Sequence, residues 1–231
     1  MENAESQPTE AHAAHRTRTF PLTRLEAFSD GVFAIVITLL VLDLHVPTSP
    51  DRLLGQLVHM WPSFLGYLVS FAFIGGSWVA HTGLTQLLRA TDGVFVSLNL
   101  LLLLFVSFLP FSTNLFTTHM TDAGQRVAVV VFGLNLTLSA VAASWLASYA
   151  ARRERLTRDA DRAQLAWLER ERWAGVALVS LSTAVSALFP KIAVVFYLTV
   201  SMLLILHPVW RLHGLGHARR QAGPPKLKGS N

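Results

Sequence analysis

Long apolar stretches alternate with short polar segments along this chain. The first stretch, 25–46, is rich in Leu, Ile, Val and Phe, and a helix of this length, rising about 1.5 Å per residue, crosses a hydrocarbon core about 30 Å thick. Five further apolar stretches lie at 61–88, 93–116, 127–151, 173–189 and 192–210. The pattern predicts an all-α, polytopic membrane protein with six transmembrane helices.

Two of these stretches depart from a simple span. Pro110 lies inside 93–116, and because proline has no N–H and disturbs the helical hydrogen bonds, it predicts a bend there. The stretch 173–189 is the shortest and is therefore the weakest element of the predicted topology.

Polar segments bound and divide the apolar region. Residues 1–23 contain no apolar stretch that could form a signal-peptide core, so we expect a cytoplasmic N-terminal tail. Segment 152–172 carries seven arginines and five acidic residues, a charge density that a bilayer core excludes. It predicts the longest internal loop, partly helical. Gly, Pro and Lys dominate 214–231, which predicts a cytoplasmic C-terminal tail and leaves 24–213 as the membrane domain.

The basic residues predict the orientation, because Lys and Arg beside membrane helices are retained on the cytoplasmic side. With six spans and a cytoplasmic N-terminus, 16 of the 19 basic residues fall inside. The three that fall outside are Arg52, Arg126 and Lys191. We therefore expect both termini in the cytoplasm and a multi-pass protein of the plasma membrane, which is the inner membrane of the cell.

The composition agrees with a membrane protein and argues against other classes. Hydrophobic residues make up 52% of the chain and charged residues 14%, whereas soluble domains carry about 25% charged residues. The net charge of +5 does not predict nucleic-acid binding, because the basic residues lie between apolar stretches rather than on one soluble face. No cysteine, phosphate-binding loop, dinucleotide glycine pattern or nucleophile elbow occurs. We expect neither an enzyme nor a metal site, and no cofactor.

Asp30 is the most informative single residue. It lies about one turn into the first predicted helix, where a carboxylate is costly without a partner. We expect it to accept a hydrogen bond from another helix, with Trp78, His81 and Asn99 as candidate donors. An interfacial position in contact with water is the alternative.

The same helix has an apolar stripe that faces away from Asp30. On an ideal helix this stripe contains Gly31, Ile35, Thr38, Leu39, Leu42 and Val46. A pore lined by it would be narrow and apolar, with Thr38 as a polar ring. Periodicity alone favours the alternative, in which the stripe packs against another helix or lipid.

Two blocks of residues resemble a known family. The first is Arg24-x-x-x-Phe28-Ser29-Asp30, which opens the first helix. The second consists of Trp78-x-x-His81, Arg89-x-x-Asp92 and the run from Asn99 to Phe111. On these residues the chain resembles the transmembrane protein 175 family of potassium channels, in its bacterial six-helix form. The last three spans match this family in number and length alone.

The resemblance implies a homotetramer in the lipid bilayer, with a central pore lined by the first helix. It implies passive conduction of potassium in preference to other monovalent cations. Ile35 would be the hydrophobic gate, Leu39 and Leu42 further apolar layers, and Thr38 the threonine linked to potassium preference. The network that holds the first helix would contain Arg24, Phe28, Ser29, Asp30, Trp78, His81 and Asn99.

Two other functions stay open. An ion-coupled or proton-coupled secondary transporter could use Asp30 and His81 at depth, although such proteins usually carry an internal repeat and none is evident here. A non-conducting membrane scaffold could bind a partner or anionic lipid through 152–172. The five acidic residues of that segment favour a solvated, self-paired loop instead.

Overall fold

The structure is a computed structural model. It describes residues 21–44, 47, 52–120, 122–153, 156–157, 162–189, 195–197, 199 and 202, with the backbone alone for 162–168 and 171. This part of the chain is helical apart from its turns and one isolated β-bridge, which joins Leu88 to Thr157.

The first half of the chain forms three helices and one 3₁₀ turn. The elements in order are α1 (Leu22–Leu39), η2 (Leu40–Asp43), α2 (Leu53–His59) and α3 (Trp61–Thr85). The 3₁₀ turn η2 continues α1 directly, so the two form one membrane-length unit. A proline in the first turn of α3 is compatible with the helix, because the first N–H groups of a helix have no partner within it.

The second half forms four helices. They are α4 (Gly93–Ser107), α5 (Leu109–Thr118), α6 (Gln125–Arg152) and α7 (Arg162–Leu188). Asp92 precedes α4 and caps it, because its carboxylate accepts a hydrogen bond of 3.0 Å from the backbone N–H of Phe95. α5 follows α4 after the single residue Phe108.

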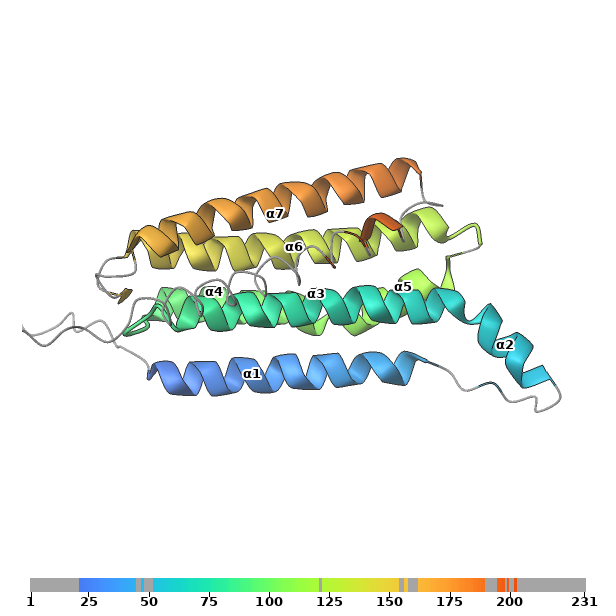
Figure 1. The fold of residues 1–231 in the computed structure, drawn as a ribbon, viewed down its shortest axis with the longest axis horizontal. Coiled ribbons are helices and arrows are strands. Elements are labelled where there is room, and N and C mark those ends of the chain that lie inside the picture. The colour runs from blue at the N-terminus through green and yellow to red at the C-terminus, as the bar shows by residue number, and fades with distance from the viewer. Residues whose placement is uncertain are drawn as a thin grey trace, which may run out of the picture.

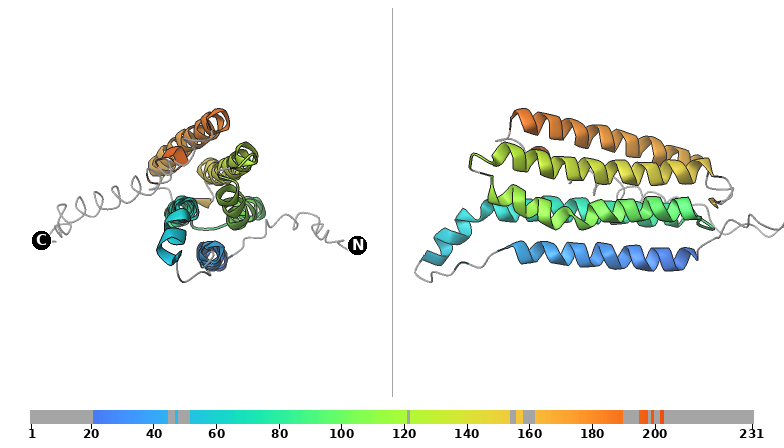
Figure 2. Two further views of the ribbon diagram at one scale, coloured as in Figure 1. Left: turned by 90° about the vertical axis from the view of Figure 1, so that its right-hand side faces the viewer. Right: turned by 180° about the vertical axis from the view of Figure 1, so that it is seen from behind.

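The long helices lie side by side along one axis, with α1 at one edge and α7 at the opposite edge (Figure 1). The end view in Figure 2 shows α1 beside α3 and α4, which are the helices it contacts most. α6 packs on α4 and α5, and α7 packs on α6. The short helix α2 projects beyond the end of the bundle and has no buried residue (Figure 1).

Four helical units are long and apolar enough to cross a membrane. They are Leu22–Asp43, Trp61–Thr85, Gly93–Thr118 and Gln125–Arg152. These units coincide with the first four predicted spans, so an all-helical protein with several membrane-length helices is confirmed. The predicted sixth span, 192–210, and the predicted tail 214–231 lie largely or wholly outside the described residues.

Two of the predicted spans have a different form in the structure. The third, 93–116, consists of two helices that meet at Phe108. The fifth is the end of the 27-residue helix α7, whose apolar part is Arg172–Leu188. The second half of the charged segment 152–172 is thus helical, because Arg, Glu, Ala and Leu are good helix formers even where their charges exclude lipid.

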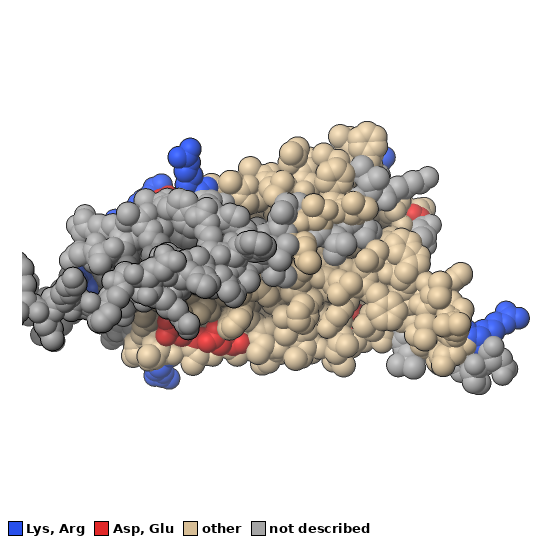
Figure 3. Space-filling view, viewed as in Figure 1, with Lys and Arg blue, Asp and Glu red and all other residues tan. Residues whose placement is uncertain are grey.

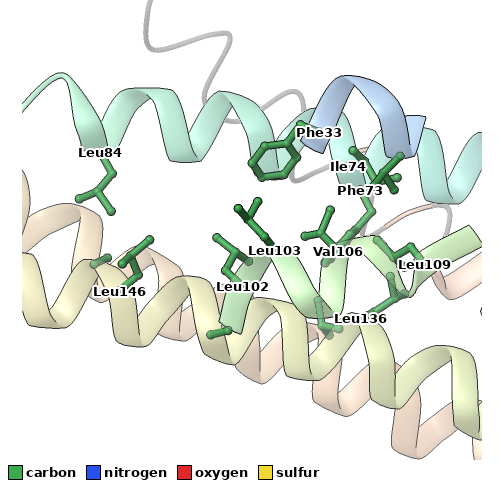
Figure 4. Packing of buried hydrophobic residues seen from close by; sticks show 14 of the residues in the cluster. Phe33, Phe73, Ile74, Leu84, Leu102, Leu103, Val106, Leu109, Leu136 and Leu146 are labelled. Carbon is green, nitrogen blue, oxygen red and sulfur yellow. The ribbon is translucent and has the colours of Figure 1, made fainter. Parts of the chain in front are cut away.

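The buried core lies between α1, α3, α4 and α6. Figure 4 shows Phe33 of α1 above Leu103 and Val106 of α4, with Ile74 of α3 nearby and Leu136 of α6 on the other side. All five side chains are at most 4% exposed. This cluster fixes the side of α1 that faces its own subunit.

The outer surface is apolar over most of its length. On the face in Figure 3, the described Lys and Arg residues lie toward the two ends, and uncharged side chains form most of the middle. Large apolar side chains such as Leu104, Leu134 and Leu181 are half exposed or more. Such a surface suits lipid, because soluble monomers rarely expose large contiguous apolar patches.

Candidate functional site

The helix α1 has one buried and one exposed face. Its buried residues, spaced at three or four positions, are Leu25, Ser29, Phe33 and Val36, and Leu40 continues this face in η2. The spacing places these side chains on one stripe, which contacts α3 and α4. The opposite side of α1 is therefore turned away from the rest of the subunit.

The predicted stripe lies on this exposed side. Ile35 is 59% exposed, Leu39 42% and Leu42 73%. Gly31 is also exposed, and a Cβ atom added to it would meet no atom within 4 Å. Among the residues that the structure describes, no helix buries this stripe. Val46 lies outside the described residues.

Thr38 is exposed on the same side. Its Oγ1 hydroxyl donates a hydrogen bond of 2.8 Å to the carbonyl oxygen of Ile35, one turn earlier. Because the hydroxyl hydrogen is used within the helix, the oxygen lone pairs of Thr38 are left for an outside donor or cation.

Asp30 and Trp78 join α1 to α3. The indole Nε1–H of Trp78 donates to Asp30 Oδ1 over 2.9 Å. Trp78 was one of the three predicted donors. Of the other two, Asn99 donates to Ser29 of α1 instead, and His81 bonds to Asn99. Both Asp30 and Trp78 are exposed at the surface of the subunit.

Ser29, Asn99 and His81 form a buried chain of hydrogen bonds across three helices. The amide Nδ2 of Asn99 donates to Ser29 Oγ over 2.9 Å, and Asn99 Oδ1 lies 2.8 Å from His81 Nε2. A carbonyl oxygen can only accept, so this arrangement gives His81 its hydrogen on Nε2. All three residues are at most 2% exposed, and the ring of Phe33 lies 5.7 Å from the ring of His81.

Arg24 and Phe28 have a different position. Both belong to the block that opens α1, but their side chains are exposed, Phe28 by 55%. Of the seven residues in the predicted network, the structure joins five by hydrogen bonds within the subunit. These five are Ser29, Asp30, Trp78, His81 and Asn99.

A further polar contact holds the other end of the helix. Asn114 Nδ2 of α5 donates to Asp43 Oδ1 at the end of η2 over 3.1 Å. The sequence pattern does not indicate this contact, because Asn114 lies 71 positions after Asp43.

Comparison with known proteins assigns the chain to a family. Residues 24–110 match the family model described as endosomal/lysosomal potassium channel TMEM175. A potassium channel of Chamaesiphon minutus is 36% identical over 184 residues, which cover 77% of this chain and 91% of that protein. This chain belongs to the TMEM175 family. The family consists of ion channels and is not an enzyme class.

Other members of the TMEM175 family agree with this assignment. The crystal structure of a lysosomal potassium-selective TMEM175 homolog from Chamaesiphon minutus matches with a TM-score of 0.70 and 34% identity, covering 82% of this chain and 97% of that one. A potassium channel of Chryseobacterium is 32% identical and is covered over 92% of its length. Human TMEM175, named an endosomal/lysosomal proton channel, is 41% identical over 119 residues, which are 24% of that protein.

The matched region of the TMEM175 model includes both polar contacts that hold the start of α1. Asp30 with Trp78, and Ser29 with Asn99 and His81, all lie between 24 and 110. Asn114 lies beyond this region, so the contact at the end of α1 is a feature of this chain that the family match does not cover.

Several polar contacts that stabilise the TMEM175 fold were not predicted. Ser70 of α3 and Thr113 of α5 share a hydrogen bond of 2.7 Å, and Asn135 of α6 donates to Ser112 of α5 over 3.0 Å. Tyr149 of α6 donates to Asp92 over 2.8 Å. Isolated Ser, Thr and Asn residues in apolar stretches are the sequence signal for such contacts, because a polar group in lipid needs a partner.

Arg172 of α7 is partly buried. Its Nη1 donates to the carbonyl oxygen of Ala143 in α6 over 3.1 Å, and its Nη2 donates to that of Ala80 in α3. The neighbouring Trp173 donates to Ser148 of α6 over 3.1 Å. These bonds attach α7 to the two helices beneath it.

The turn between α5 and α6 carries a separate charged pair. His119 Nδ1 lies 2.7 Å from Asp122 Oδ2, and the backbone N–H of Gly124 donates to Asp122 Oδ1 over 2.7 Å. The hydrogen bond with His119, and then the one from Gly124, lower the pKa of Asp122. Among the described residues, no group of His, Asp and Glu could hold a metal ion.

Proposed function

We propose that this chain is a potassium channel in which four copies surround a central pore lined by α1. Bacterial relatives 32 to 41% identical to it are named potassium channels. The single observation that carries the pore assignment is the exposed stripe of Ile35, Leu39 and Leu42 on α1, together with the polar contacts on the opposite side of the same helix.

Ile35 is the proposed gate. Four branched apolar side chains around a narrow axis expel water, and an ion cannot cross a dry constriction without losing its hydration shell. Leu39 lies about one turn further and Leu42 about two turns further, so they form two more apolar layers on the same side. Conduction then requires a small movement of α1 that widens these layers enough for water to enter.

Thr38 is the proposed polar element of the pore. Its hydroxyl hydrogen is donated to the carbonyl of Ile35, so its oxygen can face a cation with both lone pairs. Four such oxygens would replace part of the water around a potassium ion. Preference for potassium through this ring is expected to be modest, because the remainder of the stripe is apolar.

The polar contacts behind α1 give the pore helix a defined position. In a bilayer there is no hydrophobic driving force between helices, so packing and interhelical hydrogen bonds hold them together. The chain from Ser29 through Asn99 to His81 and the bond between Asp30 and Trp78 supply this hold. They fix which side of α1 is left for the pore.

We further propose that this chain lies in the plasma membrane, with six spans and both termini in the cytoplasm. The four described membrane-length units and the shorter apolar part of α7 support five of these spans. The apolar stretch 192–210 supplies the sixth, and the distribution of Lys and Arg supports the orientation.

The test is potassium flux into liposomes that contain the purified chain. Ile35→Asn places four amides at the proposed gate, and we expect the basal flux to rise, because a polar ring stays wet. Leu134→Asn is the matched control: it makes the same kind of change at a half-exposed position on α6, and we expect wild-type flux. Equal fluxes from both variants would place the gate elsewhere.

The same vesicles distinguish the channel from its alternatives. A transporter would give a flux that saturates at transporter turnover, and a scaffold would give none. Proton flux should be measured in parallel, because human TMEM175 is named a proton channel and Asp30, a residue of α1 in this chain, is exposed.

A further inference from the structure

The two ends of the pore helix are bound to two different helices. Near its start, Ser29 accepts a hydrogen bond from Asn99 of α4. At its far end, Asp43 accepts one from Asn114 of α5. α4 and α5 follow each other in the chain and are separated by a break at Phe108. The pore helix therefore spans this break, with one polar contact on each side of it.

The break has an identifiable cause. Pro110 has no N–H to donate to the carbonyl oxygen of Val106, and its ring crowds the preceding turn. Hydroxyl groups around the break bond to nearby carbonyl oxygens, Ser107 to Leu104 over 2.9 Å and Thr113 to Leu109 over 2.7 Å. Proline and such hydroxyl contacts are the usual causes of bends in membrane helices, and they make the angle between the two parts easier to change.

The proposed gate lies between the two contacts. Ile35, Thr38, Leu39 and Leu42 all fall after Ser29 and before Asp43 in the sequence. Between its ends, α1 presents apolar side chains such as Phe33 and Val36 to the bundle, and apolar contacts let helices slide and tilt more easily than a hydrogen bond does. A change of angle at the break must therefore reach this segment through its two bound ends.

α5 is in turn fixed to the rest of the bundle. Thr113 shares a hydrogen bond with Ser70 of α3, and Ser112 accepts one from Asn135 of α6. Both residues lie one turn or less from Asn114. A movement of α3 or α6 at this end of the subunit is thus passed to α5 and from α5 to Asp43.

We propose that Asp43 and Asn114 are positioning residues that couple the break at Pro110 to the gate. When the angle between α4 and α5 changes, the Asp43–Asn114 contact moves the far end of the pore helix while the Ser29–Asn99 contact holds its start. The helix then tilts, and Leu39 and Leu42 move toward or away from the axis. This inference rests on the proposed channel function.

The test is a double-mutant cycle on the full chain, read by single-channel recording in planar bilayers. Pro110→Ala restores the missing N–H, and we expect the open probability to change about fivefold, as a free-energy change of about 1 kcal/mol produces. In the Asn114→Ala background, where the contact is lost, we expect the same Pro110→Ala change to have little effect. Unitary conductance and the potassium-to-sodium ratio should stay at wild-type values throughout, because neither residue lies in the pore.

A charge swap separates coupling from simple damage. Asn114→Asp alone places a second carboxylate next to that of Asp43, and the repulsion breaks the contact. The effect of Pro110→Ala on the open probability should then be abolished. The pair D43N/N114D restores a carboxylate and an amide in exchanged places, and the effect should return. Where Pro110→Ala protein is not monodisperse in detergent, Pro110→Gly replaces it, since glycine also supplies the N–H.

The possible failures point to different conclusions. If Pro110→Ala changes the open probability equally with and without Asn114, coupling through this contact is refuted while the channel function stands. If D43N/N114D behaves like Asn114→Asp alone, the contact is not what carries the coupling. If the wild-type chain conducts no potassium in bilayers or liposomes, the proposed function and this inference both fall.

Discussion

Asn99 of α4 donates a hydrogen bond of 2.9 Å to the hydroxyl of Ser29, 70 positions earlier in the chain and on the buried face of α1. The oxygen Oδ1 of the same amide lies 2.8 Å from Nε2 of His81 in α3. One asparagine therefore ties the rotation of α1 to α4 and, through His81, to α3. If α1 turned about its axis, this bond would break and a different set of side chains would form its exposed face.

The first prediction concerns the stability that this bond supplies. Ser29→Ala leaves the buried Asn99 amide without its acceptor, which costs about 1–2 kcal/mol. We expect the apparent melting temperature in detergent, read by fluorescence-detected gel filtration, to fall by about 2–5 °C. Ser97→Ala is the control, because Ser97 is exposed and donates within its own helix to Gly93. If the melting temperature falls equally in the two variants, the bond between Ser29 and Asn99 adds no stability beyond that of an exposed serine.

The sequence allowed much of the fold to be predicted, because length and apolarity are local properties. The stretches 25–46, 61–88 and 127–151 became membrane-length helices within a few residues of their predicted bounds. The charged segment 152–172 was expected to be partly helical, but its continuation into the fifth span as the single helix α7 was not predicted. Nor could periodicity indicate that the third span is two helices rather than one bent helix.

The pairing of side chains was the part that the sequence could not supply. Trp78, His81 and Asn99 were all candidate partners of Asp30, but only the relative rotation of α1, α3 and α4 decides which donor meets which acceptor. In the structure, Trp78 donates to Asp30 and Asn99 donates to Ser29. His81 bonds to Asn99. Thr38 and the gate residues were assigned by resemblance and remain proposals.

The second prediction concerns ion preference. Thr38→Val keeps the shape of the side chain but removes the oxygen that is proposed to face the ion. Loss of an interaction of about 1 kcal/mol lowers the potassium-to-sodium permeability ratio by about fivefold. The ratio is measured from reversal potentials under bi-ionic conditions. Thr38→Ser keeps the hydroxyl and should keep the ratio. A valine variant with the wild-type ratio would remove Thr38 from the selectivity mechanism.

The third prediction concerns acid pH at the turn between α5 and α6. The pKa of Asp122 is lowered from its ordinary value of 3.8 by the hydrogen bonds from His119 and Gly124. A carboxyl group whose pKa is lower in the folded state stabilises the fold above its unfolded pKa, and this contribution is lost as the pH falls through the folded value. Asp122 is fully exposed, so we expect a small effect.

The measurement is the melting temperature of wild type and Asp122→Asn between pH 7 and pH 3. Wild type should be the more stable at neutral pH. The difference should begin to shrink as the pH falls to about 4, near the unfolded pKa, and should continue to shrink as the pH falls through the lower folded pKa. A difference that stays constant over this range would show that ionisation of Asp122 has no part in it.

The fourth prediction concerns the attachment of α7. Arg172 donates to the carbonyl oxygens of Ala143 and Ala80. In the sequence of α3, Ala80 lies between Trp78, which bonds to α1, and His81, which bonds to Asn99. Lysine is a point charge on a flexible stem and cannot reproduce the two-pronged geometry of a guanidinium. Arg172→Lys therefore keeps a partly buried charge but loses a donor, which costs about 1.5–3 kcal/mol.

Two comparisons make this prediction specific to the two carbonyl contacts. Arg172→Leu removes the charge together with its donors, so it should destabilise no more than Arg172→Lys, because an apolar residue is often tolerated where a buried charge has been removed. Arg170→Lys changes an exposed arginine two positions earlier on α7 and should leave the melting temperature unchanged. If Arg172→Lys has the same melting temperature as Arg170→Lys and wild type, the carbonyl bonds do not hold α7. If it melts lower than both, the two carbonyl bonds of the guanidinium attach α7 to α6 and to α3, the helix that carries Trp78.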